Sequence, residues 1–170
     1  MNIFYLDKNP YLAAQYHCDK HVVKMILETA QMLCTAHRIL DKHKEHPDVL
    51  YKTTHVNHPS SIWVRDSLAN YNWTVQLFLG LCDEYTYRYN KTHLTDIKLR
   101  KILSRSPENI KIAKLTQPPQ CMPDEYKREN AVLGYRNYYV GEKEHMLKYT
   151  IRSEPLWLQD WLYEKHGECV

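Results

Sequence analysis

Glycine is scarce in this sequence, with 4 among 170 residues, and clear alternation of apolar and polar residues is confined to the opening NIFYL stretch. Strands and hairpins rely on such alternation and on glycine-containing turns, so there is little room for a β-sheet. No apolar run approaches the roughly 20 residues that a membrane span needs, and MNIFYLDKNP lacks the pattern of a signal peptide. We therefore expect a cytoplasmic protein without a membrane span.

The five cysteines are odd in number and include no Cys-x-x-Cys pair. This pattern argues against both a disulfide framework and a thiolate zinc site. We expect reduced, packed thiols and no bound metal or cofactor.

What the sequence does contain suits a globular protein with a polyanionic partner. Hydrophobic residues make up 44% and charged residues 25%, and the formal net charge is +3. The 10 histidines and 14 tyrosines combine a flat apolar ring with a polar edge, as surfaces that meet nucleobases do.

Helical periodicity recurs along the chain and predicts an all-α fold. We expect residues 1–170 to form a single domain and a monomer, a compact bundle with two long central helices. Asn9-Pro10 begins the first, which runs to about Leu40 with a bend near His17, and Pro59 begins the second, which runs to about Tyr89. Shorter helices are expected over 95–104 with Thr95 as N-cap, from near Pro123 through 146, and over 154–166; residues 106–123 form a loop on a fixed path.

The first long helix carries a narrow polar stripe. At about 100° per residue, the polar side chains between residues 17 and 31 fall within an arc of roughly 100°, and apolar side chains cover nearly all the rest. This pattern predicts that the helix is deeply packed and that the stripe lines a cleft. The stripe consists of His17, Lys20, His21, Lys24, Glu28 and Gln31.

The stripe has the groups that handle a phosphodiester. Lys20 and Lys24 would hold the anion. An imidazole, that of His17 or His21, would move protons together with Glu28.

Two alternatives stay open. In the first, His17, His21, Glu28 and His58 bind the metal of a metal-dependent nuclease or hydrolase. The ammonium groups on the same face disfavour a cation there. In the second, the chain is a non-catalytic helical module that binds nucleic acid or a host protein; a structural protein whose stripe is merely solvated would be non-catalytic as well.

Two further segments fit a nucleic-acid partner. Asn57 is the expected N-cap of the second long helix, Trp63 belongs in its core, and His58 and Arg65 lie where a helix N-terminus attracts phosphate. Later in the chain, aromatic and basic residues interleave as they do on strand-binding surfaces, although packing explains the tyrosines equally well. This later group consists of Tyr135, Arg136, Tyr138, Tyr139 and Lys143.

These three segments, in this order, resemble the pyrimidine-dimer DNA glycosylase/endonuclease V family. In DKHVVKMILETAQ, four residues keep the places of the family's helix motif, namely Lys20, Lys24, Glu28 and Gln31, whereas His21 stands where the family has arginine. NHPSSIW matches its Asn-His-Pro and tryptophan, and YRNYYVGEK is similar to its last segment. The chain also resembles small proteins encoded by bacteriophages, which would place it in the host cytoplasm.

The resemblance implies an all-α enzyme that kinks duplex DNA and flips out a damaged or modified pyrimidine. An N-terminal α-amine would attack the sugar C1′, form an imine and, in an AP-lyase step, cut the strand by β-elimination. Because Asn2 is too large for efficient removal of the initiator methionine, the amine would be that of Met1. Glu28, with His17 or His21, would move protons.

Overall fold

The computed structural model describes residues 1–42, 44, 45 and 47–167, and these residues form helices and connecting segments without a strand. The all-α prediction is therefore confirmed. The α-helices are α1 (Pro10–Tyr16), α2 (Asp19–Leu40), α3 (Pro59–Asp66), α4 (Leu68–Tyr89), α5 (Leu94–Leu103), α6 (Ala131–Lys143) and α7 (Leu156–His166); Asp124–Tyr126 and Glu144–Met146 are 3-10 turns.

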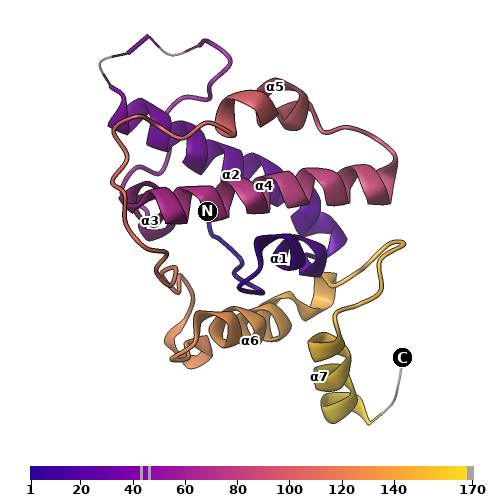
Figure 1. Ribbon diagram of the computed structural model, residues 1–170. Helices are drawn as coiled ribbons and strands as arrows, with labels where there is room; N and C mark the ends of the chain where they lie inside the picture. The colour runs from indigo at the N-terminus through magenta and orange to yellow at the C-terminus, as the bar shows by residue number, and fades with distance from the viewer. Residues whose placement is uncertain (43, 46, 168–170) are drawn as a thin grey trace.

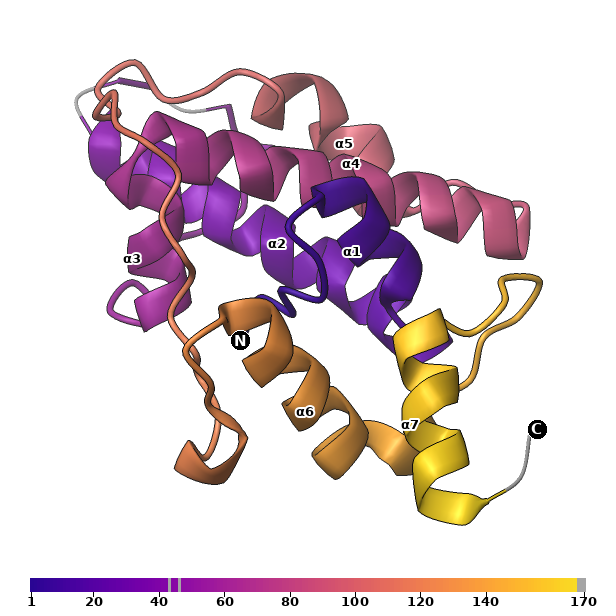
Figure 2. The same ribbon diagram turned by 60° about the horizontal axis from the view of Figure 1, so that its bottom comes forward.

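Two helices of 22 residues, α2 and α4, form the centre of the bundle and pack against each other, as predicted. α1 lies on α4, while α3 and α5 pack against both central helices (Figure 1). α6 and α7 lie below this group, and Figure 2 shows the N-terminus of the chain beside the first turn of α6. No helix in the described ranges has the length and apolar character that a membrane crossing requires.

The start of the first helical unit follows the predicted chemistry. The side chain of Asn9 caps α1 by accepting from the backbone N–H groups of Tyr11 and Leu12, and Pro10 occupies the first turn. The bend expected near His17 is a complete break, because His17 and Cys18 both have extended backbone. α2 therefore begins with a new direction at Asp19.

The second long helix predicted from Pro59 is in fact two helices. Ser67 has extended backbone, with φ −149° and ψ 155°, and its hydroxyl accepts from Asn70 N at 3.1 Å as the N-cap of α4. Apolar spacing continues across this position, so periodicity alone did not reveal the break. Trp63 in α3 is buried, as expected.

Two predicted N-caps and one predicted helix start were wrong, while α3 does begin at Pro59 as predicted. His58 caps α3 in place of Asn57, and His93 caps α5 in place of Thr95; in each case the ring accepts a backbone N–H two residues later. The helix expected from Pro123 begins only at Ala131, with Asn130 as its cap, after a single 3-10 turn.

The segment 106–123 follows a fixed path across the surface, as predicted. Thr116 anchors it, because its N–H donates to Asn70 Oδ1 at 3.1 Å and its hydroxyl accepts from Trp63 Nε1 at 2.9 Å. Gln117 Oε1 then accepts from Ala131 N at 2.8 Å. The segment thus joins the central helices to α6 and passes the N-terminus of the chain.

Candidate functional site

The N-terminus is held beside α2 by residues from distant parts of the chain. The backbone N–H of Asn2 donates to Glu28 Oε2 at 3.3 Å, and its side-chain Nδ2 donates to the Cys121 carbonyl at 3.0 Å. The hydroxyl of Tyr135 lies 2.9 Å from Asn2 Oδ1. These contacts fix the chain one residue after the α-amine of Met1.

Glu28 is the carboxylate of this site. Its side chain is 15% exposed, and each oxygen has a partner: Oε2 accepts from Asn2, and Oε1 lies 3.4 Å from Lys24 Nζ one turn earlier on α2. The carboxylate is therefore fixed but remains open to solvent.

His58 is the third member of the site. Its Nδ1 accepts from Ser60 N at 3.2 Å, which leaves the ring proton of the neutral imidazole on Nε2. Burial lowers the pKa of His58, and the positive charge of the N-terminal amine lowers this pKa further, while Glu28 acts in the opposite direction. The N-terminal amine and Glu28 are thus close enough to His58 for their charges to act on its pKa.

The other two residues predicted to be catalytic lie in the core. His17 is completely buried; its Nδ1 donates to the Ala13 carbonyl at 2.6 Å, and its Nε2 has no partner. His21 is 5% exposed and stacks on Phe4. Burial is the main cause that lowers the pKa of His17 to about 4 and that of His21 to about 3.

The predicted polar stripe is therefore not a single face, and that expectation was wrong. His17 precedes α2, and His21 turns inward because the Tyr139 hydroxyl lies 2.9 Å from its Nδ1. The exposed line of α2 contains Lys20, Val23, Lys24 and Leu27, with Val23 and Leu27 38% and 41% exposed.

The residues predicted to contact DNA divide into exposed and structural ones. Lys20, Lys24 and Asn57 are exposed, and Tyr138 and Lys143 are half-buried. Arg65 donates to the Val56 carbonyl at 2.8 Å and to Ser61 Oγ at 3.2 Å.

Three residues of α6 serve the packing of the fold. Tyr135 and Tyr139 are completely buried. Arg136 donates to the Leu6 carbonyl at 2.9 Å and pairs with Asp7 at 3.2 Å. The contact between the Tyr135 hydroxyl and Asn2 could not be predicted from the sequence, because the two residues are 133 positions apart.

Among the described residues, no group of three or more histidine, cysteine, aspartate and glutamate side chains is arranged to hold a metal ion. The four donors of the metal-dependent alternative are accordingly not gathered in one place. Two of them, His17 and His21, are buried in the core, whereas Glu28 accepts from Asn2 N and His58 caps α3.

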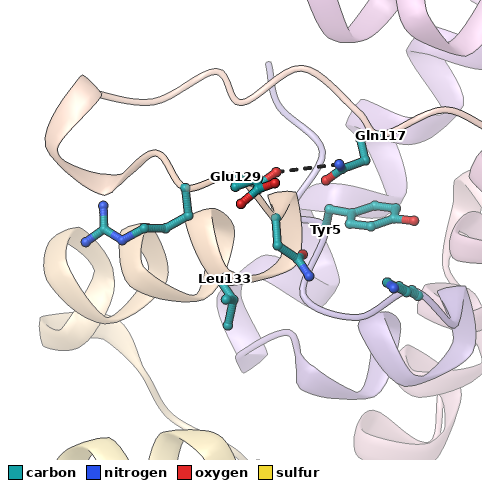
Figure 3. A pocket seen from close by; sticks show the side chains of 7 residues that line it. Tyr5, Gln117, Glu129 and Leu133 are labelled. Carbon is teal, nitrogen blue, oxygen red and sulfur yellow. Dashed lines mark hydrogen bonds between the residues drawn. The ribbon is translucent and has the colours of Figure 1, made fainter.

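Two hollows lie next to this region. The larger, about 640 Å³, lies between the N-terminal segment and the start of α6; Gln117 crosses it to meet the Glu129 carbonyl at 3.5 Å (Figure 3). The smaller, about 420 Å³, begins at Pro59, directly after His58, and its walls are mainly apolar. Its lining residues are Pro59, Ile62, Trp63, Asp66, Gln117 and Pro119.

These features define a class: a small all-α protein whose N-terminal segment is held by a carboxylate of a long helix that also carries exposed lysines. A model of the pyrimidine dimer DNA glycosylase family matches residues 1–97, which is more than half of the chain. The chain belongs to this family, which supports a DNA glycosylase role in general and DNA as its substrate. Searches of curated proteins and of solved structures gave no significant match.

Proposed function

We propose that this protein is a DNA glycosylase with AP-lyase activity that removes a damaged or modified pyrimidine through an imine formed by its N-terminal amine. The observation that carries the proposal is the position of the N-terminus. Asn2 N lies 3.3 Å from Glu28 Oε2, and the charge of the α-amine lowers the pKa of His58. A nucleophile beside a proton acceptor and a neutral N–H donor is the arrangement that covalent catalysis needs.

The reaction begins when the lone pair of the Met1 amine forms a bond to C1′ and the C1′–N bond to the base breaks. The base leaves with the electron pair of that bond and takes up a proton. The new C1′ ammonium loses a proton as O4′ departs with its electron pair and is protonated, which gives the protonated imine. His58 Nε2–H is suited to hydrogen-bond the departing base or oxygen, and Glu28 accepts the proton from nitrogen.

Strand cleavage follows from the same intermediate. Glu28 gives its proton to O4′ and is again a carboxylate. It then removes a proton from C2′, the electrons form the C2′–C3′ double bond, and the C3′–O bond breaks with loss of the phosphate. Water then hydrolyses the imine and frees the amine. The proposal takes Met1 as the first residue of the mature chain, and the intact mass of the purified protein checks this.

The exposed line of α2 is the proposed DNA-binding surface. Lys20 and Lys24 would contact phosphates, while Val23 and Leu27 offer apolar contact beside them. Lys20 and Glu28 are eight residues apart on α2, or about 12 Å at the rise of an α-helix. The hollow of about 420 Å³ next to His58 has the size and apolar walls expected for a flipped base.

Borohydride trapping tests the chemistry. The protein is incubated, with chelator present, with labelled duplexes that carry an abasic site, a cyclobutane thymine dimer, uracil or a hydroxymethylated base. Borohydride reduces an imine to a stable amine, so the proposal predicts a covalent protein–DNA adduct that maps to Met1. An adduct on another residue, such as Asn2 after loss of Met1, would correct the nucleophile.

Variants separate chemistry from binding. Glu28→Gln should bind the duplex but lose most of its strand cleavage, whereas Glu164→Gln, an exposed carboxamide variant on α7, should cleave normally. A chain extended by one uncleaved residue before Met1 should bind DNA without forming an adduct. If the folded wild type binds DNA and forms no adduct with any duplex, the imine mechanism is wrong, which leaves a glycosylase without a lyase step, the metal-dependent enzyme or the non-catalytic module.

A further inference from the structure

The side chain of Asn2 is held in one orientation by backbone groups. Asn2 Oδ1 accepts from Ile3 N at 2.8 Å, and Asn2 Nδ2 donates to the Cys121 carbonyl at 3.0 Å. A backbone N–H can only donate and a carbonyl can only accept, so these two bonds fix which way the carboxamide points. This orientation does not depend on the position of any hydroxyl proton.

The support for this carboxamide comes from α6 and from the segment before it, beside which the N-terminus lies (Figure 2). The Tyr135 hydroxyl lies 2.9 Å from Asn2 Oδ1 and 2.6 Å from the Pro119 carbonyl oxygen. Both of these oxygens can only accept, so the hydroxyl donates toward them, and it accepts from Cys121 N at 3.4 Å. Because Tyr135 is completely buried, the packing of α6 fixes the place of its hydroxyl. We call the Asn2 carboxamide, the Cys121 carbonyl and the Tyr135 hydroxyl the Asn2 clamp.

The Asn2 clamp acts directly beside the groups of the proposed chemistry. The backbone N–H of Asn2 donates to Glu28 Oε2 at 3.3 Å, and the α-amine belongs to the residue before it. Met1 itself is half-buried and packs against the core. The first residues of a chain are poorly ordered unless they are tied down, and the side chain of Asn2 ties them to two distant parts of the fold.

We propose that the Asn2 carboxamide is a positioning residue of the reaction, which holds the Met1 amine in one direction relative to Glu28, with the Cys121 carbonyl and the Tyr135 hydroxyl as its support. The carboxamide acts through the amine and not through contact with DNA. The entropy of ordering the nucleophile is then lost when the protein folds and not at the reaction step. The proposal rests on the proposed function for the identity of the nucleophile, whereas the ordering of the N-terminus does not depend on that function.

Asn2→Leu tests the clamp, because it removes both amide groups with little change in volume. Leucine, like asparagine, is too large for efficient removal of Met1, which the intact mass checks. Adduct formation with an abasic duplex and borohydride is followed in single turnover over a range of protein concentrations. The rate constant at saturation should fall about 5- to 30-fold, the factor that corresponds to fixing the backbone of one residue. The protein concentration that gives half of this rate should not change, because the clamp does not contact DNA.

Two tyrosine variants separate positioning from loss of stability. Tyr135→Phe keeps the buried ring, loses the hydroxyl and should lower the same rate constant by a smaller factor. The double variant with Asn2→Leu should lose no more than Asn2→Leu alone, because both changes act through one clamp. Tyr71→Phe is the matched control, since Tyr71 is also buried and its hydroxyl donates to the Leu103 carbonyl at 2.9 Å, at the end of α5. This control should lower the free energy of unfolding and leave the rate constant unchanged.

A second readout needs no DNA. Relaxation of ¹⁵N measures the order parameter of the backbone amide at residue 2. This order parameter should be about 0.85 in the wild type and in Tyr71→Phe, and below about 0.6 in Asn2→Leu. An ordered residue 2 in Asn2→Leu, or a wild-type rate constant in that variant, would overturn the proposal.

The two proposals fail separately. If the wild type forms no adduct, the imine mechanism is wrong, and the order parameters alone decide whether the clamp orders the N-terminus. If the wild type forms an adduct and Asn2→Leu forms it at the same rate, the clamp is wrong and the imine mechanism stands. Circular dichroism checks the fold, and if either Asn2→Leu or Tyr135→Phe does not fold, the other decides both readouts.

Discussion

Acidification from about pH 7.5 to about pH 5 should remove about 4 kcal/mol from the free energy of unfolding, through two buried histidines. His17 has a pKa of about 4 and His21 of about 3 in the folded protein, against an ordinary value of 6.5. In both cases burial is the first cause, since a charged imidazole loses its hydration in the core. The folded state must therefore keep both rings neutral.

The sign follows from proton binding. Both folded pKa values lie below the unfolded value, so the unfolded chain binds more protons in the interval between them. The contribution of the two neutral rings to the free energy of unfolding is fully present above about pH 6.5 and is lost as the pH decreases below that value. At about pH 5, which is about 1.5 units below the unfolded value, each ring costs about 2 kcal/mol at about 1.4 kcal/mol per unit.

Other titrating groups do not obscure this interval. The pKa values of His58 and His93 are lowered as well and act in the same direction. Asp19 and Asp41 also have lowered pKa values, but their carboxylates are protonated only below about pH 4, where a further loss of stability begins.

Urea unfolding followed by tryptophan fluorescence, at half-unit steps of pH, measures the effect. His21→Phe keeps the ring in place and should show about half of the wild-type loss between these pH values. A free energy of unfolding that changes by less than about 1 kcal/mol over the interval would contradict the burial of neutral rings.

Three further substitutions test the packing, each by urea unfolding. Asp19→Ala should cost about 3 kcal/mol, because it removes the carboxylate 3.0 Å from the buried guanidinium of Arg88. Gly80→Ala should cost about 1 to 3 kcal/mol, because the new Cβ would lie 2.9 Å from Ala14 Cβ and force α1 away from α4; an unchanged stability would show that the helices adjust freely. Ile151→Gly should stabilise the protein by about 1 kcal/mol, because a β-branched residue with φ of 67° is strained there; a loss would mean that its side chain makes a compensating contact.

Local chemistry in the sequence predicted much of the fold. Proline after a capping residue marked the starts of α1 and α3, and helical spacing identified the two central helices. The break at Ser67 was missed because the residues around it keep their apolar spacing through a change of direction. A serine is a good N-cap, but it is also an ordinary residue on a helix surface, so its identity did not decide the matter.

The candidate site was less accessible to prediction because its members are joined by long-range contacts. Helical spacing placed His21 on the polar face of α2, but a hydroxyl 118 residues later satisfies its Nδ1 and allows it to turn inward. Val23 and Leu27 look like core residues in the sequence and are exposed. The expectation that Glu28 serves the N-terminal amine came from the family resemblance, and the geometry of Asn2 supports it.

The contacts that hold Asn2 determine when the N-terminal residues reach their final position during synthesis of the chain. A ribosome makes the N-terminal residues first, yet two of the three groups that hold Asn2 belong to Cys121 and Tyr135, which are among the later residues to be made. For most of translation, Asn2 therefore lacks the contacts with Cys121 and Tyr135. The N-terminal residues of the nascent chain therefore reach their final position only after the last third of the polypeptide has emerged from the ribosome.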